Sequence, residues 1–184
     1  MGDPRKARKT YSRPRSPWRA DQLAQELYLL GTFGLRNKRE LWKAQTRLSS
    51  VRKQARTLLA ATAAVRAREE RKLLTSLHRQ GLVVEGAALD DILNLTVEDV
   101  LSRRLQSLVF KKGLAISPLH ARQLVVHGHV LIGDRSITIP GYLVQTNEEG
   151  SIKLTGLKAP EAPAAPSPAP APEQKAEAQA AVPE

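Results

Sequence analysis

The apolar residues of this 184-residue chain change their spacing near residue 128, and this change restricts the fold more than any other feature. Up to Val125 they recur every three or four residues, which is the period of an amphipathic helix. After that they alternate, first at Val130 and Ile132 and then at Ile137 and Ile139, which is the period of a strand. The sequence therefore predicts an α+β fold: a mainly helical, basic N-terminal region, and a small module of two helices followed by an antiparallel sheet.

Capping signals divide the first half of the chain into helices. Ser16 followed by Pro17 is an N-cap before a proline at the first helical position, and Gly34 stops the helix that begins there. Asn37 with Glu40 three residues later resembles a capping box. We therefore expect a short helix followed by a long one that starts at Asn37.

Three more start signals follow. Thr62 is a break in the long helical stretch and caps a new helix. Thr96 caps a helix whose last turn contains Lys112, and Ser117 before Pro118 starts the next helix. These last two are the predicted helices of the small module.

The predicted sheet has several short strands. Gly133 and Asp134 form the turn between the first two strands. A third strand is expected at 142–144, and the residues 147–150 form a turn before a last strand at 152–154. This makes the module a compact unit with its own apolar faces.

Charge is distributed unevenly along the sequence. Residues 1–80 carry a net charge of +14, residues 81–100 carry −5, and residues 101–144 carry +5. A like-charged helix face lacks the opposite-sign pairs that stabilise an ordinary solvated helix. Two basic blocks separated by an acidic one therefore indicate two surfaces for an anionic partner, in a chain whose formal net charge is +11.

Nucleic acid is the anionic partner that the pattern favours, and an anionic membrane surface is the alternative. No apolar run of about 18 residues is present, so we expect no transmembrane helix. Since nucleic acid is favoured over a membrane surface, we also expect no membrane partner. The basic segment at 1–15 cannot bury enough apolar surface to fold alone, and we expect it to become ordered on a nucleic acid.

The sequence contains no arrangement that argues for catalysis. It has no phosphate-binding glycine loop, no zinc-protease signature and no nucleophile elbow. Cysteine is absent, and His127 and His129 have no third metal ligand nearby. We therefore expect no enzyme activity, no metal, no cofactor and no small-molecule substrate.

The basic residues instead indicate contacts with phosphates, because each Lys or Arg that neutralises a phosphate adds affinity whatever the base sequence. In the module, one face is expected to carry Lys111, Lys112, Arg122 and His129, the N-terminus of the second helix, and Arg103 and Arg104 one or two turns back. On the long helix, phosphate contacts are expected from Arg47, Arg52, Lys53 and Arg56.

Several blocks, in order and at consistent spacing, resemble the small-subunit ribosomal protein S4 family. RRLQSLVFKKGLA at 103–115, HARQLVVHGH at 120–129 and IPGYLV at 139–144 are similar to the RNA-binding module of that family. LDDILNLTVEDVL at 89–101 and YLLGTFGLRNKRELW at 28–42 are similar to its archaeal and eukaryotic branch. The resemblance covers roughly residues 3–155, and the missing cysteines fit a zinc-free version of the family.

The resemblance implies a function that composition alone does not. A member of this family is a structural protein and a primary binder of small-subunit ribosomal RNA, helps to nucleate assembly of the subunit body, and contributes to translational accuracy. It is cytoplasmic, in the small ribosomal subunit, and contacts neighbouring ribosomal proteins, notably the S5 type. Carried onto this chain, the RNA contacts fall at Arg104, Lys112, Ser117, His120, Arg122, Gln123, His127, His129 and Tyr142.

The expected organisation has four parts. They are a basic N-terminal arm at 1–15, a helical rRNA-binding region at 16–95, an RNA-binding module of the S4 type at 96–158, and a disordered Ala/Pro/Glu tail at 159–184. Two other functions remain open at this point. One is an RNA-modifying or tRNA-acting accessory protein that uses the same module, and the other is a basic DNA-binding protein with helix-turn-helix geometry.

Overall fold

The computed structural model describes residues 9–155. The predicted tail at 159–184 and the first eight residues of the predicted arm lie outside the described residues.

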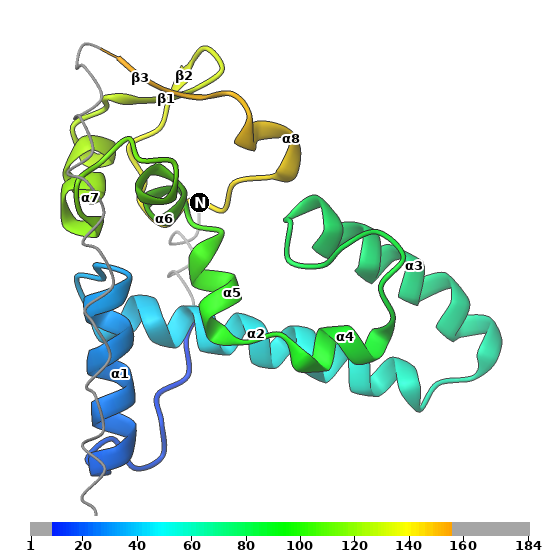
Figure 1. Ribbon diagram of the computed structural model, residues 1–184. Coiled ribbons are helices and arrows are strands. Elements are labelled where there is room, and N and C mark those ends of the chain that lie inside the picture. The colour runs from blue at the N-terminus through cyan, green and yellow to red at the C-terminus, as the bar shows by residue number, and fades with distance from the viewer. Residues whose placement is uncertain (1–8, 156–184) are drawn as a thin grey trace, which may run out of the picture.

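The described residues form helices in the N-terminal two thirds and a small sheet near the C-terminal end (Figure 1). The helices are α1 (Ala20–Thr32), α2 (Lys38–Leu59), α3 (Ala63–Arg79), α4 (Leu89–Asn94), α5 (Val97–Ser102), α6 (Leu105–Lys111), α7 (Pro118–Val126) and α8 (Thr146–Glu149). The strands are β1 (Val130–Ile132), β2 (Arg135–Ser136) and β3 (Ile152–Leu154). The α+β class predicted from the change of period is confirmed.

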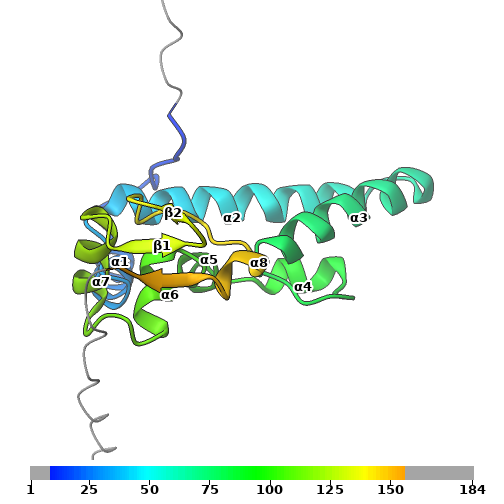
Figure 2. The same ribbon diagram turned by 90° about the horizontal axis from the view of Figure 1, so that it is seen from above.

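Helix α2 is the axis of the N-terminal part. Helix α3 folds back along it as a hairpin, and seen from above the α2–α3 loop lies at the end of the molecule farthest from the sheet (Figure 2). Helices α1, α4 and α5 also pack against α2. Leu41 and Leu48 of α2 pack with Val100 and Leu101 of α5 in one apolar cluster, and Ala55 begins a second cluster with α3 and α4. The burial of these α2 residues orients α2 and leaves its polar residues on the remaining faces.

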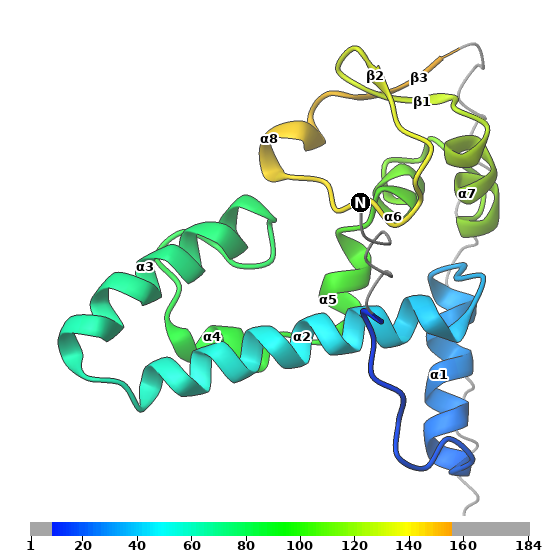
Figure 3. The ribbon, with the colours of Figure 1, turned by 180° about the vertical axis from the view of Figure 1, so that it is seen from behind.

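The module packs α6 and α7 against the sheet. The strand order is β2-β1-β3, with β1 antiparallel to both neighbours. Its core consists of Leu105, Leu108, Val109, Ala115, Ala121, Leu124, Val125, Val130, Ile132, Val144 and Ile152. Seen from behind, α8 lies between the sheet and the C-terminal end of α3, where the Thr146 hydroxyl donates to the carbonyl oxygen of His78 at 3.0 Å (Figure 3). The module therefore touches the N-terminal part both at α3 and along α2.

Several predicted helix ends are confirmed. Thr62 and Thr96 are the N-cap residues of α3 and α5, and Thr96 forms a capping box with Asp99. The Ser117 hydroxyl accepts the amide of His120 at the start of α7, with Pro118 at the first helical position. These signals act within one turn of chain, so the local sequence is sufficient to set them.

The single helix expected from 97 to 112 is wrong, because the chain breaks it into α5 and α6 at Arg103 and Arg104. The amide of Leu105 donates to the carbonyl oxygen of Tyr142 at 2.8 Å instead of to a carbonyl one turn earlier in a helix. The Ser107 hydroxyl in turn donates to the carbonyl oxygen of Leu101 at 2.7 Å, near the end of α5. The break depends on residues about 40 positions away, which a local pattern does not contain.

The third strand expected at 142–144 is also wrong. Those residues run beside the α5–α6 break, with one isolated bridge between Leu143 and Arg104, and take no place in the sheet. The alternating pattern at Ile137 and Ile139 likewise lies beyond the end of β2. The predicted turn before the last strand is the one-turn helix α8.

The first helix also starts later than its cap signal indicates. Arg19 is the N-cap of α1, and Ser16 and Pro17 lie in the preceding irregular segment. The structure offers no physical reason for this shift. Part of the predicted arm nevertheless lies against α2, since the Tyr11 ring stacks on Trp42 with 6.0 Å between ring centroids, and the amide of Ser12 donates to the Thr46 hydroxyl at 2.9 Å.

Candidate nucleic-acid interface

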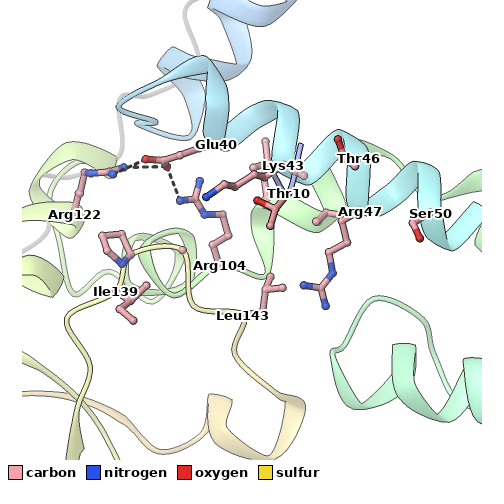
Figure 4. A pocket seen from close by; sticks show the side chains of 15 residues that line it. Thr10, Glu40, Lys43, Thr46, Arg47, Ser50, Arg104, Arg122, Ile139 and Leu143 are labelled. Carbon is pink, nitrogen blue, oxygen red and sulfur yellow. Dashed lines mark hydrogen bonds and ion pairs between the residues drawn. The ribbon is translucent and has the colours of Figure 1, made fainter. Parts of the chain in front are cut away.

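A cleft of about 680 Å³ lies between α2 and the segment 139–143 of the module (Figure 4). Its wall on α2 carries Lys43 and Arg47, and its wall on the module carries Arg104 and Arg122. One carboxylate, that of Glu40, lines it as well. The lining residues thus carry four positive charges and one negative charge, so an anion entering the cleft meets a net positive field.

The carboxylate of Glu40 joins the two arginines of the module to α2. One of its oxygens accepts from Nη2 of Arg104 at 2.6 Å, and the other accepts from Nη2 of Arg122 at 2.6 Å (Figure 4). Nη1 of Arg122 also donates to Glu40, at 3.2 Å. Ion pairs of this length that are also hydrogen bonds are the strong kind.

Burial and the arginines act on Glu40 in opposite directions. Burial alone would raise the pKa of the Glu40 carboxyl, but the hydrogen bonds and charges of Arg122 and Arg104 outweigh it and hold that pKa below its usual range. Glu40 therefore stays ionised at neutral pH, which keeps both ion pairs intact.

Gln106 extends this polar contact into the packing of α1 and α7. Its side-chain amide donates to the carbonyl oxygens of Gly34 and Pro118, both at 2.9 Å, while its carbonyl accepts from Arg122 at 3.2 Å. Gly34 has a φ of +56°, and a Cβ there would lie 2.8 Å from the Cβ of Pro118. The loop before α2 and the start of α7 are therefore in close contact beside Glu40.

The guanidinium of Arg103 bonds to other parts of the protein, although it was predicted to contact a phosphate. Its guanidinium donates to the carbonyl oxygen of Gln80 at 3.0 Å and pairs with Glu149 at 2.8 Å, with a further bond to the carbonyl of Val144. This side chain joins α3, α8 and the α5–α6 break. The structure does not place it with the cleft residues.

The four basic residues predicted on α2 do not share one environment. Arg47 lines the cleft, where its guanidinium also donates to the side chain of Gln80 at 2.8 Å. Arg52 is half-buried and donates to the backbone carbonyl of Leu95. Lys53 and Arg56 are exposed, and within the described residues they form no ion pair.

The two lysines at the end of α6 also lie apart from the cleft. Lys111 is exposed beside a smaller cavity lined by Glu98 and Asp99, and Lys112 donates to the backbone carbonyl of Glu149. A phosphate was predicted to bind the free backbone amides at the N-terminus of α7. One of them, the amide of His120, already donates to the Ser117 hydroxyl, so one donor fewer is left for a phosphate.

The other residues carried over from the family resemblance lie on or near the surface of the module. Gln123 and His127 are exposed, and the rings of His127 and His129 are 6.4 Å apart. The hydroxyl of Tyr142 donates to the Glu148 carboxylate at 3.0 Å; burial and this carboxylate raise the pKa of Tyr142. Of the predicted residues, the structure brings Arg47, Arg104 and Arg122 together in the cleft and leaves the rest elsewhere.

Two cleft residues were missed by the sequence interpretation. Lys43 is one helical turn before Arg47, and this i, i+4 spacing on one face was the signal that could have identified it. Glu40 was assigned to a capping box with Asn37, whose side chain makes no capping bond. No local signal identifies its true partners, which are 64 and 82 residues away.

Among residues 9–155, no three His, Cys, Asp or Glu side chains are grouped so that they could hold a metal ion. None of the helices described there has both the length and the apolar character needed to cross a membrane.

Two family models together match nearly all of the described chain. Residues 5–102 match the Ribosomal protein S4/S9 N-terminal domain, and residues 103–149 match the S4 domain. The accessory-enzyme alternative needs a catalytic domain beside the S4 module, but the first match fills that part of the chain.

Curated relatives have similar sequences over most of their length. The chain is 57% identical over 156 residues to the small ribosomal subunit protein uS4 of Cenarchaeum symbiosum, covering 85% of this chain and 76% of the relative. It is 56% identical over 149 residues to uS4 of Ignicoccus hospitalis, covering 81% and 90%. It is 50% identical over 165 residues to uS4 of Hyperthermus butylicus, covering 90% and 92%. With both family models and these relatives in agreement, the chain belongs to the ribosomal protein S4 family.

Proposed function

We propose that this protein is a structural, non-enzymatic component of the small ribosomal subunit, and that it binds ribosomal RNA through the cleft between α2 and the module. One observation carries this proposal. Two cationic residues of α2, Lys43 and Arg47, face two of the module, Arg104 and Arg122, across one cleft that contains a single acid (Figure 4). Such an arrangement suits a chain of phosphates that passes between the two halves of the protein.

The relatives support the choice of RNA, since each is named a small ribosomal subunit protein. The exposed Lys53 and Arg56 lie nearer the C-terminal end of α2 and outside the cleft lining. We further propose phosphate contacts by these two residues, and by Lys111 and Lys112 on the module. Arg103 and Arg52, which bond inside the molecule, act instead by holding the elements in place.

The remaining residues that the family resemblance implied are proposed to contact RNA on the outer face of the module. They are Ser117, His120, Gln123, His127, His129 and Tyr142. We also propose that the protein is cytoplasmic, helps to nucleate the subunit body, contributes to translational accuracy, and contacts a neighbour of the S5 type. The proposed division into a helical region at 16–95 and a module at 96–158 places the cleft between the two parts.

A filter-binding comparison tests the RNA function. The full chain should bind small-subunit rRNA of Hyperthermus butylicus more tightly than the large-subunit rRNA of the same organism, at equal salt. Replacing Lys43 and Arg47 together by Ala should weaken the binding of small-subunit rRNA at least tenfold.

The matched control replaces Arg68 and Arg71 of α3 by Ala, which removes the same charge outside the cleft. This control should lose much less affinity. Equal binding of both RNAs by the unmodified chain would refute the proposed function. Equal losses in the two double variants would refute the cleft as its site.

A further inference from the structure

We infer that Glu40 is a positioning residue that fixes the orientation of the module on α2 and so assembles the cationic cleft; this inference rests on the proposed RNA function. The sequence gives Glu40 no such role, and no RNA contact is required of it. Its effect passes through Arg104 and Arg122, which it holds together by ion pairs of 2.6 Å.

The first argument is electrostatic. Two guanidinium groups that donate to the same carboxylate lie close enough to repel each other strongly when that carboxylate is absent. Both come from the module, from the start of α6 and from α7, while Glu40 comes from the first turn of α2. The attraction that offsets this repulsion therefore also helps to hold the module on α2, beside the apolar contacts of α5.

The second argument is burial. The side chain of Arg104 is only 9% exposed, and its Nη1 atom is buried with no hydrogen-bond partner among the described residues. A buried charge with an unsatisfied donor is costly unless a strong partner compensates for it. Glu40 is the acid that pairs with it, so ionised Glu40 is the partner that offsets the cost of burying Arg104.

The third argument concerns the contacts that surround this ion-pair cluster. Gln106 bonds to Arg122 and to backbone carbonyls in the α1–α2 loop and at Pro118. A Cβ at Gly141 would lie 3.4 Å from Nη2 of Arg104, so the segment 139–143 of the module also lies close to this side chain. A change at Glu40 is thereby transmitted to both walls of the cleft.

The test replaces Glu40 by Gln in the full chain and measures orientation and binding separately. The protein has no cysteine, so Gln54→Cys on α2 and Asp134→Cys in the β1–β2 turn provide two sites for spin labels. Both positions are exposed and lie outside the cleft lining. Glu98→Gln, an exposed residue on α5, is the matched control that removes one negative charge and no ion pair found in the described chain.

In the Glu40→Gln protein we expect a broader distribution of distances between the spin labels. The affinity ratio of small-subunit to large-subunit rRNA of Hyperthermus butylicus should fall at least tenfold. The dependence of binding on salt should become steeper by up to about two counterions, because Glu40 no longer offsets part of the charge that Arg104 and Arg122 present to phosphates. The spin-label distances distinguish a positioning role from the removal of a nearby negative charge, which changes the slope alone, and Glu40→Asp should recover part of the ratio.

An unchanged distance distribution together with an unchanged affinity ratio, as in the Glu98→Gln control, would overturn the inference. If the unmodified chain bound small-subunit and large-subunit rRNA equally, the proposed function would be refuted instead. The spin-label distances alone would then decide the role of Glu40. If the Glu40→Gln chain does not fold, Arg122→Gln is the second variant. It retains the pair of Arg104 with Glu40 and should broaden the distances relative to the Glu98→Gln control, whereas distances equal to those of the control would overturn the inference.

Discussion

Glu40 and Arg122 are 82 residues apart in the sequence, yet their side chains form an ion pair of 2.6 Å that joins the first turn of α2 to α7. Both groups are largely buried, with side-chain exposures of 21% and 20%. A partly buried pair of this kind is strongly destabilising when one partner is removed. Removing Glu40 should therefore change both the stability of the fold and the dependence of that stability on pH.

The first prediction concerns acid. The arginines hold the folded-state pKa of Glu40 below its value in the unfolded chain, so the stabilisation is complete above the unfolded pKa. It is lost as the pH falls through the folded pKa. Glu40→Gln should therefore lower the free energy of unfolding by about 2–4 kcal/mol at pH 7.

The difference in that free energy between the two proteins should shrink as the pH is lowered from about 5 towards 3. Urea unfolding at a series of pH values measures it. An offset that stays constant across the series would contradict the assignment of the stabilisation to ionised Glu40.

The second prediction separates neighbours on α2. Replacing Lys53 and Arg56 by Ala should reduce the slope of log affinity against log salt by about one unit per lost phosphate contact, with little change in stability. Replacing Arg52 by Ala should leave the slope nearly unchanged. It should lower the free energy of unfolding by about 1–3 kcal/mol, because the carbonyl of Leu95 loses a charged donor.

Binding at several salt concentrations, combined with denaturation of each variant, distinguishes the two roles. If Arg52→Ala alone flattened the salt slope, its guanidinium would have to leave the Leu95 carbonyl for a phosphate, and the separation made here would be wrong.

The parts of the fold that the sequence predicted correctly depend on neighbouring residues. Thr96 and Ser117 cap their helices within a single turn, Thr62 occupies the N-cap position of α3, and the change of apolar period is visible without any tertiary information. The parts that it predicted wrongly depend on distant partners. At the break before Leu105 the amide of Leu105 bonds to the carbonyl of Tyr142, and residues 142–144 run beside this break instead of in the sheet.

The same distinction applies to the candidate site. Basic residues can be recognised from the sequence alone, so Arg104 and Arg122 were identified as candidates. Contact of either residue with RNA stays a prediction. The sequence does not show whether a basic residue is exposed or engaged, and Arg52 and Arg103 proved to be engaged internally. Glu40 was assigned to the nearest local pattern because its partners lie in another part of the chain.

The third prediction concerns Arg103. Its replacement by Ala should lower the free energy of unfolding by about 2–4 kcal/mol, because Glu149 loses its partner and the carbonyl of Gln80 loses a charged donor. The salt slope of RNA binding should be unchanged in conditions where the variant is folded. A flatter slope with normal stability would instead show that Arg103 binds phosphate, as the predicted basic face of the module first indicated.

The fourth prediction uses two glycines as a matched pair. Gly81 and Gly86 both have positive φ values, of +66° and +83°. A Cβ at Gly81 would lie 2.6 Å from the Cζ of Arg103, whereas nothing lies within 4 Å of one at Gly86. Both Ala variants should lose about 1 kcal/mol to backbone strain. Gly81→Ala should lose more, because it also displaces the Arg103 guanidinium, and equal losses in thermal unfolding would contradict that packing.

The last prediction is that residues 97–155 fold without the rest of the chain. All the core residues of the module, from Leu105 to Ile152, lie within this fragment, and so does the whole three-stranded sheet. A unit of this size buries a smaller fraction of its surface than a larger domain, so we expect cooperative but marginally stable thermal unfolding.

Helix α5 should be the weak part of that fragment. Val100 and Leu101 pack against α2 in the full chain, and they become exposed when α2 is removed. Arg104 and Arg122 also lose the carboxylate of Glu40, so added phosphate should stabilise the fragment more than it stabilises the full chain. Circular dichroism melts of both proteins, with and without inorganic phosphate, test this. A fragment that unfolds without a cooperative transition would show that the module needs α2 to fold, and would make the Glu40 contact part of its core stability.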